Sequence, residues 1–497
     1  MNYEVIVIGG GPVGLTVAAE LALADIKVCV IEQLKETTPY SKALTIHPRS
    51  LELLDMRGLK GRLLELGQPL PTGHFAVLDT RLDFSALDSA SNYTLYLEQE
   101  HTEQMLEDWA RSLGVDILRE QRALRIEQHD ERAEVLVSGR DGESLLTAQY
   151  VVGADGAGST ARKQAGIAFN GTDTTITAIL GDVALNEPPA GPVSSYNEKG
   201  IVMIVPMTPP LYRVVVVDAA RTGVPKEEPV TLDELCSSLQ RIVGTDYGIT
   251  DAHWLSRFGN ATRQADRYRE GRILLAGDAA HIHFPAGGQG MNVGLQEAFN
   301  LGWKLAAQIK GKAPDWLLDS YHEERYPVNT ALLRNTEVQT MLMESSPKVK
   351  ELRDLLSRML QIPAANYIMA EQISAFHVRY APDANMPEHP LNGCRLADIQ
   401  IKLSDGSIHR FYDYFHSGKF VLLHAVDEPS LQEACSGLDD QRVLVVQGEV
   451  ESTKADWHNV HAALVRPDGY VAWAVNRTED NVHEIIKKGL DHWGLKA

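Results

Sequence analysis

The chain has 497 residues, 44% hydrophobic and 23% charged, which is the composition of a soluble globular protein of about three domains. Its formal net charge of −20 disfavours partners that present phosphates, namely nucleic acid and anionic membrane surfaces. The four cysteines form no CxxC pair, no apolar run approaches the ~20 residues of a membrane span, and no signal peptide is recognisable. The sequence therefore predicts a cytoplasmic protein without a zinc or redox-dithiol site.

The first elements form a β-α-β unit around a glycine turn. A strand over 3–8 precedes Gly9-Gly10-Gly11-Pro12-Val13-Gly14, a helical pattern covers 13–24, and a strand over 27–31 ends at Glu32. In such a GxGxxG turn the first glycine permits the bend, the second admits a pyrophosphate, and the third lets the helix pack closely. A carboxylate at Glu32 can bind a ribose diol and disfavours a 2′-phosphate, so the motif predicts FAD or NAD.

The middle of the chain mixes helices and strands. We expect helices over 51–66 and 102–113, and strands over 115–118, 122–129, 133–139 and 144–152. Farther on, Ile201–Val205 and Leu211–Val217 are expected to form a β-hairpin. A helix over 231–243 should be capped by Thr231, with Glu234 three residues later.

Two more glycine-rich turns follow apolar strands. The first, at 152–159, contains Asp155 and precedes Arg162. In the second, Asp278 follows a strand at the carboxyl edge of the sheet, where its carboxylate can hold a sugar or ribityl hydroxyl. Gly287, Gly288 and Gly290 then precede a long helix over 291–309, whose positive end would stabilise a reduced, anionic flavin ring.

These elements predict an α/β fold of three domains. A discontinuous Rossmann-like FAD-binding domain covers 1–75, 98–170 and 266–385, and a β-sheet substrate-binding domain covers 76–97 and 171–265. After a proline-rich linker over 381–390, a small α/β domain occupies 386–497. The apolar hairpin region suggests a hydrophobic, polycyclic substrate. Its candidate contacts are Met203, Val205 and Arg213.

The three glycine-rich turns, in this order, resemble those of the class A flavoprotein aromatic hydroxylases, the single-component FAD monooxygenases of the para-hydroxybenzoate hydroxylase fold. Within this family the chain resembles the larger members that act on polyketides, phenols and antibiotics such as rifamycins. Lys42-Ala43-Leu44 resembles the family's Arg-Ala-Leu stretch, and Gln99 resembles a glutamine that contacts FAD. The stretch 464–473 resembles the thioredoxin-like C-terminal domain, without a CxxC, which favours a packing or dimerisation role.

The resemblance implies that the flavin performs the chemistry. NADPH or NADH reduces FAD, and a C4a-hydroperoxide formed with O₂ passes one oxygen atom to an aromatic small molecule. No metal and no catalytic triad are expected, and the protein would be a monomer or a homodimer. The implied cofactor-binding residues are Gly9, Gly11, Pro12, Val13, Gly14, Glu32, Lys42, Gln99, Leu124, Asp155, Asp278, Pro285, Gly288, Gly290, Met291 and Asn292.

Other functions remain open at this point. A flavin halogenase is disfavoured because no two of the seven tryptophans form a Trp-x-Trp pair. An FAD-dependent reductase or dehydrogenase of the same superfamily, and a protein that only sequesters a flavin or a drug, are the alternatives. Oxygen consumption stimulated by a substrate would distinguish the hydroxylase from both.

Overall fold

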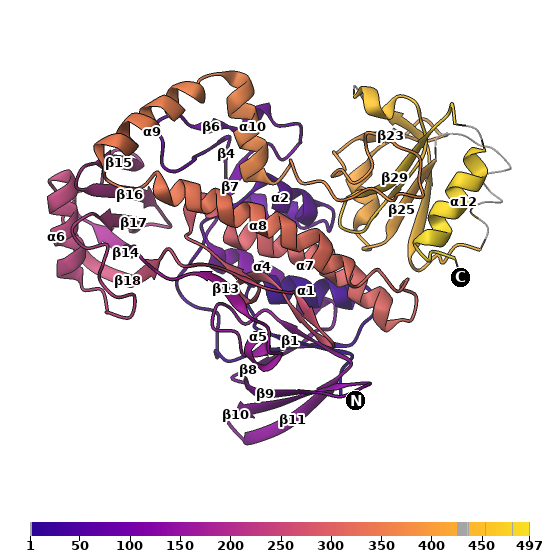
Figure 1. Ribbon diagram of the computed structural model, residues 1–497, viewed down its shortest axis with the longest axis horizontal. Coiled ribbons are helices and arrows are strands. Elements are labelled where there is room, and N and C mark those ends of the chain that lie inside the picture. The colour runs from indigo at the N-terminus through magenta and orange to yellow at the C-terminus, as the bar shows by residue number, and fades with distance from the viewer. Residues whose placement is uncertain (1, 425–434, 436, 453, 480, 497) are drawn as a thin grey trace.

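A six-stranded sheet carries the first glycine turn. The computed structural model describes residues 2–424, 435, 437–452, 454–479 and 481–496 (Figure 1). In spatial order the strands are β20 (Arg269–Glu270), β21 (Ile273–Leu275), β12 (Tyr150–Gly153), β1 (Val5–Ile8), β2 (Val28–Glu32) and β8 (Asp116–Arg119). All pairings are parallel except that of β20 with β21. The predicted β-α-β unit is confirmed, and the turns after β1 and β12 lie at one edge of the sheet with the end of β2.

Helices cover one face of this sheet and a small antiparallel sheet covers the other (Figure 1). The helices are α1 (Pro12–Leu23), α4 (Gln99–Ser112), α7 (Gly290–Ile309) and α8 (Ser320–Met341). The small sheet consists of β9 (Arg122–Gln128), β10 (Ala133–Gly139) and β11 (Gly142–Ala148). Helix α1 packs against both α4 and α7. Among the described residues, no helix combines the length and apolarity needed to cross a membrane.

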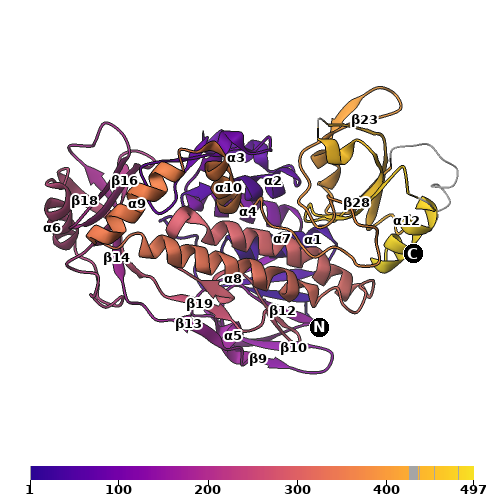
Figure 2. The ribbon, with the colours of Figure 1, turned by 45° about the horizontal axis from the view of Figure 1, so that its top comes forward.

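A second, five-stranded sheet forms the end of the molecule opposite the C-terminal region, with helix α6 (Leu232–Val243) on its outer face (Figure 2). Its strands, in spatial order, are β15 (Val193–Asn197), β16 (Gly200–Pro206), β17 (Leu211–Asp218), β14 (Thr177–Leu185) and β18 (Ile249–Gly259). The predicted hairpin is confirmed as β16 and β17, which pair antiparallel. The predicted cap is also confirmed, because the Thr231 side chain accepts a hydrogen bond from the Glu234 N–H. A three-stranded sheet of β13 (Phe169–Thr172), β19 (Thr262–Ala265) and β22 (His281–Ile282) lies between the two large sheets.

Two predicted elements are each divided in the structure. The expected helix over 51–66 is two helices, α2 (Pro48–Asp55) and α3 (Lys60–Leu66). The chain turns between them at Gly58, where φ is +72°, a conformation that breaks a helix and favours glycine. The expected strand over 144–152 is divided between β11 of the small sheet and β12 of the central sheet.

The stretch 76–97 does not join the five-stranded sheet with which the sequence grouped it. Its strands β6 (Leu82–Asp83) and β7 (Thr94–Tyr96) pair with other short strands of the N-terminal region. These partners are β3 (Thr45–Ile46), β4 (Gln68–Leu70) and β5 (Thr72–Gly73). The helices α9 (Pro347–Met359) and α10 (Pro363–Ser374) cover the segment, and Leu82 and Phe84 share a buried core with Ile373. Because these helices are distant in sequence, local periodicity did not reveal the grouping.

The C-terminal region folds around its own four-stranded sheet, drawn in yellow in Figure 1. The strands are β26 (Val443–Gln447), β25 (Phe420–His424), β28 (Val460–Val465) and β29 (Val471–Asn476). Three short strands, β23 (Gln400–Lys402), β24 (Ile408–Arg410) and β27 (Glu449–Glu451), form a further sheet. Helix α12 (Val482–His492) packs against β29.

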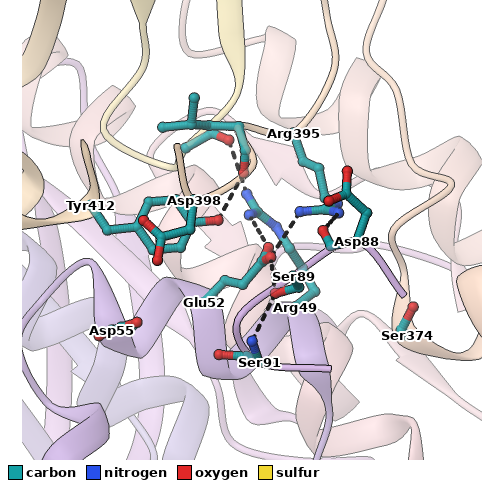
Figure 3. A network of polar contacts seen from close by, with 12 residues as sticks. Arg49, Glu52, Asp55, Asp88, Ser89, Ser91, Ser374, Arg395, Asp398 and Tyr412 are labelled. Carbon is teal, nitrogen blue, oxygen red and sulfur yellow. Dashed lines mark hydrogen bonds and ion pairs between the residues drawn. The ribbon is translucent and has the colours of Figure 1, made fainter. Parts of the chain in front are cut away.

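Buried charges attach this region to the N-terminal part of the chain. Arg49 of α2 donates to the backbone carbonyls of Asp468 and Gly469, at 2.8 and 3.2 Å. The Glu52 carboxylate lies between Arg49 and Arg395, with contacts of 2.9 and 2.8 Å (Figure 3). The docking surface is therefore a specific polar network, and α2 is held directly by the C-terminal region.

Candidate active site

A cavity of about 1070 Å³ runs from the first glycine turn to the inner face of the five-stranded sheet. It is lined by the loops at the carboxyl edge of the central sheet, by the segment 284–291, and by one face of β16 and β17. This edge is where open α/β sheets bind their ligands. The cavity brings the three predicted glycine sites and the predicted substrate residues together.

The first glycine turn has the shape of a pyrophosphate site. Gly9 has φ +109°, and a Cβ atom added to Gly14 would lie 1.9 Å from the Gly9 carbonyl oxygen. A Cβ added to Gly11 would meet no atom within 4 Å, so bare backbone borders open space there. Pro12 and Val13 line the cavity and begin α1, while Gly14 lies behind them, outside the lining. The turn leaves room where the phosphates of a dinucleotide bind.

Glu32 stands at the end of β2, beside this turn. Its carboxylate accepts hydrogen bonds from the N–H groups of Gly10, at 2.7 Å, and Leu34, at 2.8 Å. The side chain is partly exposed and lines the cavity. The carboxylate oxygens have further lone pairs for a ribose diol.

The segments around Lys42 and Gln99 form an adjoining wall. Gln99 accepts from the Ala43 N–H at 2.9 Å and donates to Glu103 at 2.6 Å. Lys42 is exposed and lines the cavity. Leu124, by contrast, is not in the lining, although the neighbouring Ala123 is. Side chains alternate along a strand, and because Ala123 faces the core, the Leu124 side chain faces outward with an exposed fraction of 37%.

Asp155 lines the cavity and also organises its own loop. Its carboxylate accepts from the Ser159 hydroxyl, at 2.5 Å, and from the N–H of Thr160, at 2.6 Å, at the start of α5 (Thr160–Gln164). Arg162 donates to the carbonyl of Ala279 at 2.8 Å. The second and third glycine sites are thereby bonded to each other.

The Asp278 side chain is exposed in the cavity and has no hydrogen bond or ion pair with the described residues.

Glu297 of α7 is a buried carboxylate that sequence analysis missed. It holds the loop around Asp278 by accepting a hydrogen bond from the Gly277 N–H at 2.7 Å and by contacting His281 Nε2 at 2.7 Å. Burial raises the pKa of Glu297, but His281 and Arg325 lower it more, so the net shift is downward. The signal available in the sequence was that Glu297 is one of only two charged residues in α7, the other being Lys304.

The segment 285–291 forms a backbone platform at the start of α7. Pro285, Gly288, Gly290 and Met291 line the cavity. Gly288 has φ +66°, and a Cβ there would lie 2.7 Å from the Thr45 hydroxyl, so a side chain has no room.

Asn292 lies behind the platform and outside the lining of this cavity. It accepts from the His47 N–H at 2.7 Å and donates to the carbonyls of Thr45 and Gly288, at 3.1 and 2.9 Å. The side-chain amide of Asn292 thus connects the 285–291 platform to the segment 45–47.

The five-stranded sheet presents an apolar wall at the other end of the cavity. Alternation along β16 and β17 directs one set of side chains to α6 and the other to the cavity. The cavity set includes Ile201, Met203, Val205, Arg213, Val215 and Val217. The Arg213 guanidinium is fully engaged with the Asp182 carboxylate, at 2.7 Å, and with the carbonyls of Ser41 and Lys42. Arg213 therefore fixes the 41–42 loop to the sheet and adds little free positive charge.

Three histidines line the cavity: His47, His74 and His283. His283 donates through Nδ1 to the Phe284 carbonyl at 2.6 Å. Burial lowers the pKa of His47 and of His74 to about 4, so both rings are neutral at pH 7. Sequence analysis gave neither His47 nor His74 a role in the site, because an isolated histidine carries no spacing signal.

The residues present fit FAD. One cavity contains the open space at Gly11, the Glu32 carboxylate, the Asp278 carboxylate, which has no partner among the described residues, and the 285–291 platform. This fold and site define a flavin-binding oxidoreductase of the α/β class.

Comparison with known proteins agrees with the assignment of a flavin-binding oxidoreductase. Residues 2–336 match the FAD binding domain family, and residues 389–494 match the family described as aromatic-ring hydroxylase, C-terminal. The chain is 53% identical to the uncharacterized aromatic compound monooxygenase YhjG of Bacillus subtilis, over 99% of this chain and 98% of that protein. It is 40% identical to a rifampicin monooxygenase of Streptomyces venezuelae, over 95% of each chain. The structure of OxyS anhydrotetracycline hydroxylase from Streptomyces rimosus superposes with a TM-score of 0.92, at 39% identity, over all of both chains.

The protein belongs to the FAD-dependent aromatic-ring hydroxylases, and it is a monooxygenase. The protein family, the fold class and the enzyme class that the sequence predicted are confirmed.

Proposed function

We propose that this monooxygenase hydroxylates a polycyclic, largely apolar aromatic molecule, using NADPH or NADH as reductant. The observation that carries the proposal is that the apolar face of β16 and β17 and the 285–291 platform line the same cavity. Ile201, Met203 and Val215 offer a flat hydrophobic surface to a ring system. The relatives named for rifampicin and anhydrotetracycline support a substrate of this size class.

The chain's own residues would bind the cofactor and orient the substrate. Gly11 and the start of α1 would hold the pyrophosphate, Glu32 the ribose, Asp278 the ribityl chain, and the 287–290 backbone the ring. When bound, FAD supplies the activation of dioxygen that the protein's side chains cannot supply. The reaction balances as substrate, O₂, NAD(P)H and a proton giving hydroxylated substrate, NAD(P)⁺ and water.

The reductant would share this cavity. The sequence contains one GxGxxG turn, and that turn belongs to the FAD site. The exposed Lys42, which lines the cavity, supplies positive charge for the phosphates of NADPH or NADH.

Substrate-stimulated turnover tests this proposal. Purified holoenzyme is mixed with NADPH or NADH and with rifampicin, anhydrotetracycline or 1-naphthol, while pyridine nucleotide and oxygen are followed. We expect oxygen consumption that rises with substrate and a product 16 mass units heavier. A reductase would oxidise NAD(P)H without adding this mass, and a sequestering protein would bind the aromatic compound without consuming oxygen; either result would refute the proposal.

A further inference from the structure

His47 and His74 are two histidines of the cavity lining, and His47 lies beside Gly288 of the 285–291 platform. Both rings line the cavity, and they are close enough that each positive charge would repel the other. The cavity lining also contains the apolar residues Val77, Phe84 and Ile373, and the charge of Arg81 lies near His74. Arg213, the charged group of the sheet wall, is occupied by Asp182 and by backbone carbonyls.

The tautomer of His47 is fixed by its surroundings. Its Nδ1 lies 3.1 Å from the Ile373 carbonyl oxygen, which can only accept, so Nδ1 carries the hydrogen. Nε2 is then a bare acceptor. It lies 3.6 Å from the position that a Cβ would take on Gly288, so it points toward the platform where the flavin ring would bind. Burial keeps the ring unprotonated and lowers its pKa to about 4.

His74 supplies a second imidazole with unused bonding capacity. Its Nδ1 is buried and has no hydrogen-bond partner in the described part of the chain. Burial, together with the nearby charges of Arg81 and His47, lowers the pKa of His74 to about 4. Neither ring nitrogen of His74 bonds to a described residue, so a ligand in the cavity that His74 lines can use the remaining hydrogen-bonding capacity of the ring.

We propose that His47 and His74 together bind a hydroxyl group on the aromatic ring of the substrate, with the bare Nε2 of His47 accepting its hydrogen. This inference rests on the proposed function and assigns the two residues that would recognise the hydroxyl group of the substrate. A hydroxyl that donates to an imidazole leaves more electron density on the ortho and para carbons, where an electrophilic oxygen attacks. The two histidines would thus select for a hydroxyl-bearing ring and orient it toward the flavin.

Matched ligands test the inference in the holoenzyme. The probes are 1-naphthol and 1-methoxynaphthalene, which differ by the donor hydrogen, and binding is followed by the change in flavin absorbance. Unsubstituted protein should bind 1-naphthol about tenfold more tightly, the usual effect of losing one hydrogen bond and leaving its buried partner unsatisfied. The variants H47L and H74L should reduce this preference, while their affinity for the ether stays unchanged. H47Q, whose amide oxygen can accept, should recover part of it.

The control is H253L, because His253 is exposed on β18 and bonds to the Pro39 carbonyl outside the cavity. It should keep the full preference. Equal binding of the two probes by unsubstituted protein would overturn the inference and leave the proposed hydroxylation intact, and this comparison requires no variant. Failure of both probes to bind would overturn the inference together with the proposed substrate class.

Discussion

Arg466 of the C-terminal region forms two ion-pair contacts with Glu324 of α8, with nitrogen–oxygen distances of 2.6 and 2.8 Å. Lys304 of α7 donates to the same carboxylate at 2.7 Å, and Arg466 also pairs with Asp468 at 2.6 Å. Burial raises the pKa of Glu324, but Arg466 and Lys304 lower it far more, so it stays ionised. The two parts of the chain are thus joined through a buried, charge-balanced cluster.

Substitution E324Q should destabilise the whole protein. It leaves Arg466 and Lys304 buried with one compensating carboxylate, and breaking a buried pair of this kind costs about 3–5 kcal/mol. Urea unfolding, followed by flavin fluorescence, measures the loss in the free energy of unfolding. The control is D108N, which removes the ion pair of Arg62 with Asp108, whose side chains are 53% and 44% exposed. Its effect should stay below about 1 kcal/mol, and equal effects of the two substitutions would contradict the interpretation.

Two glycine substitutions should separate cofactor binding from folding. G11A adds a Cβ that meets no protein atom within 4 Å, so stability of the FAD-free protein should be unchanged. FAD affinity should fall at least about tenfold, because the methyl group occupies the space of the pyrophosphate. G14A, whose Cβ would lie 1.9 Å from the Gly9 carbonyl, should lose both stability and FAD. Flavin fluorescence titration and thermal unfolding provide the readouts; normal FAD binding by G11A would be the contrary result.

D278A should weaken FAD binding without affecting the stability of the FAD-free protein. The Asp278 carboxylate bonds to no described residue, so its removal breaks no contact within the protein. We expect a roughly tenfold loss of FAD affinity, the usual effect of losing a hydrogen bond to a charged group. The loss should appear in the dissociation constant measured by equilibrium dialysis. A lower melting temperature of the FAD-free variant would show that Asp278 has a structural role instead.

Stability should fall as the pH drops below about 6.5. The pKa of His47 is about 4 in the folded protein, against about 6.5 in an unfolded chain. Between these values the unfolded chain binds a proton that the folded protein does not, so acid favours unfolding. Each pH unit in this window should reduce the free energy of unfolding by about 1.4 kcal/mol through His47. H47Q should show a shallower slope in urea unfolding from pH 7 to 5, and an identical slope would contradict the assignment.

The elements that could be predicted from the amino-acid sequence are those whose signals are local. The strand, glycine turn, helix and Glu32 of the first unit lie within about thirty residues, so spacing alone predicted their fold and ligand class. The Thr231 cap and the β16–β17 hairpin were predictable for the same reason.

Tertiary structure alone decided which distant residues meet. Glu297 of α7 accepts a hydrogen bond from the Gly277 N–H, and Asn292 accepts one from the N–H of His47, which is distant in sequence. Arg466 of the C-terminal region pairs with Glu324 of α8. Leu124 lies outside the cavity lining because the orientation of its side chain depends on the core against which β9 packs. Such contacts arise from long-range packing and burial, which are global properties of the fold and leave no periodic trace in the chain.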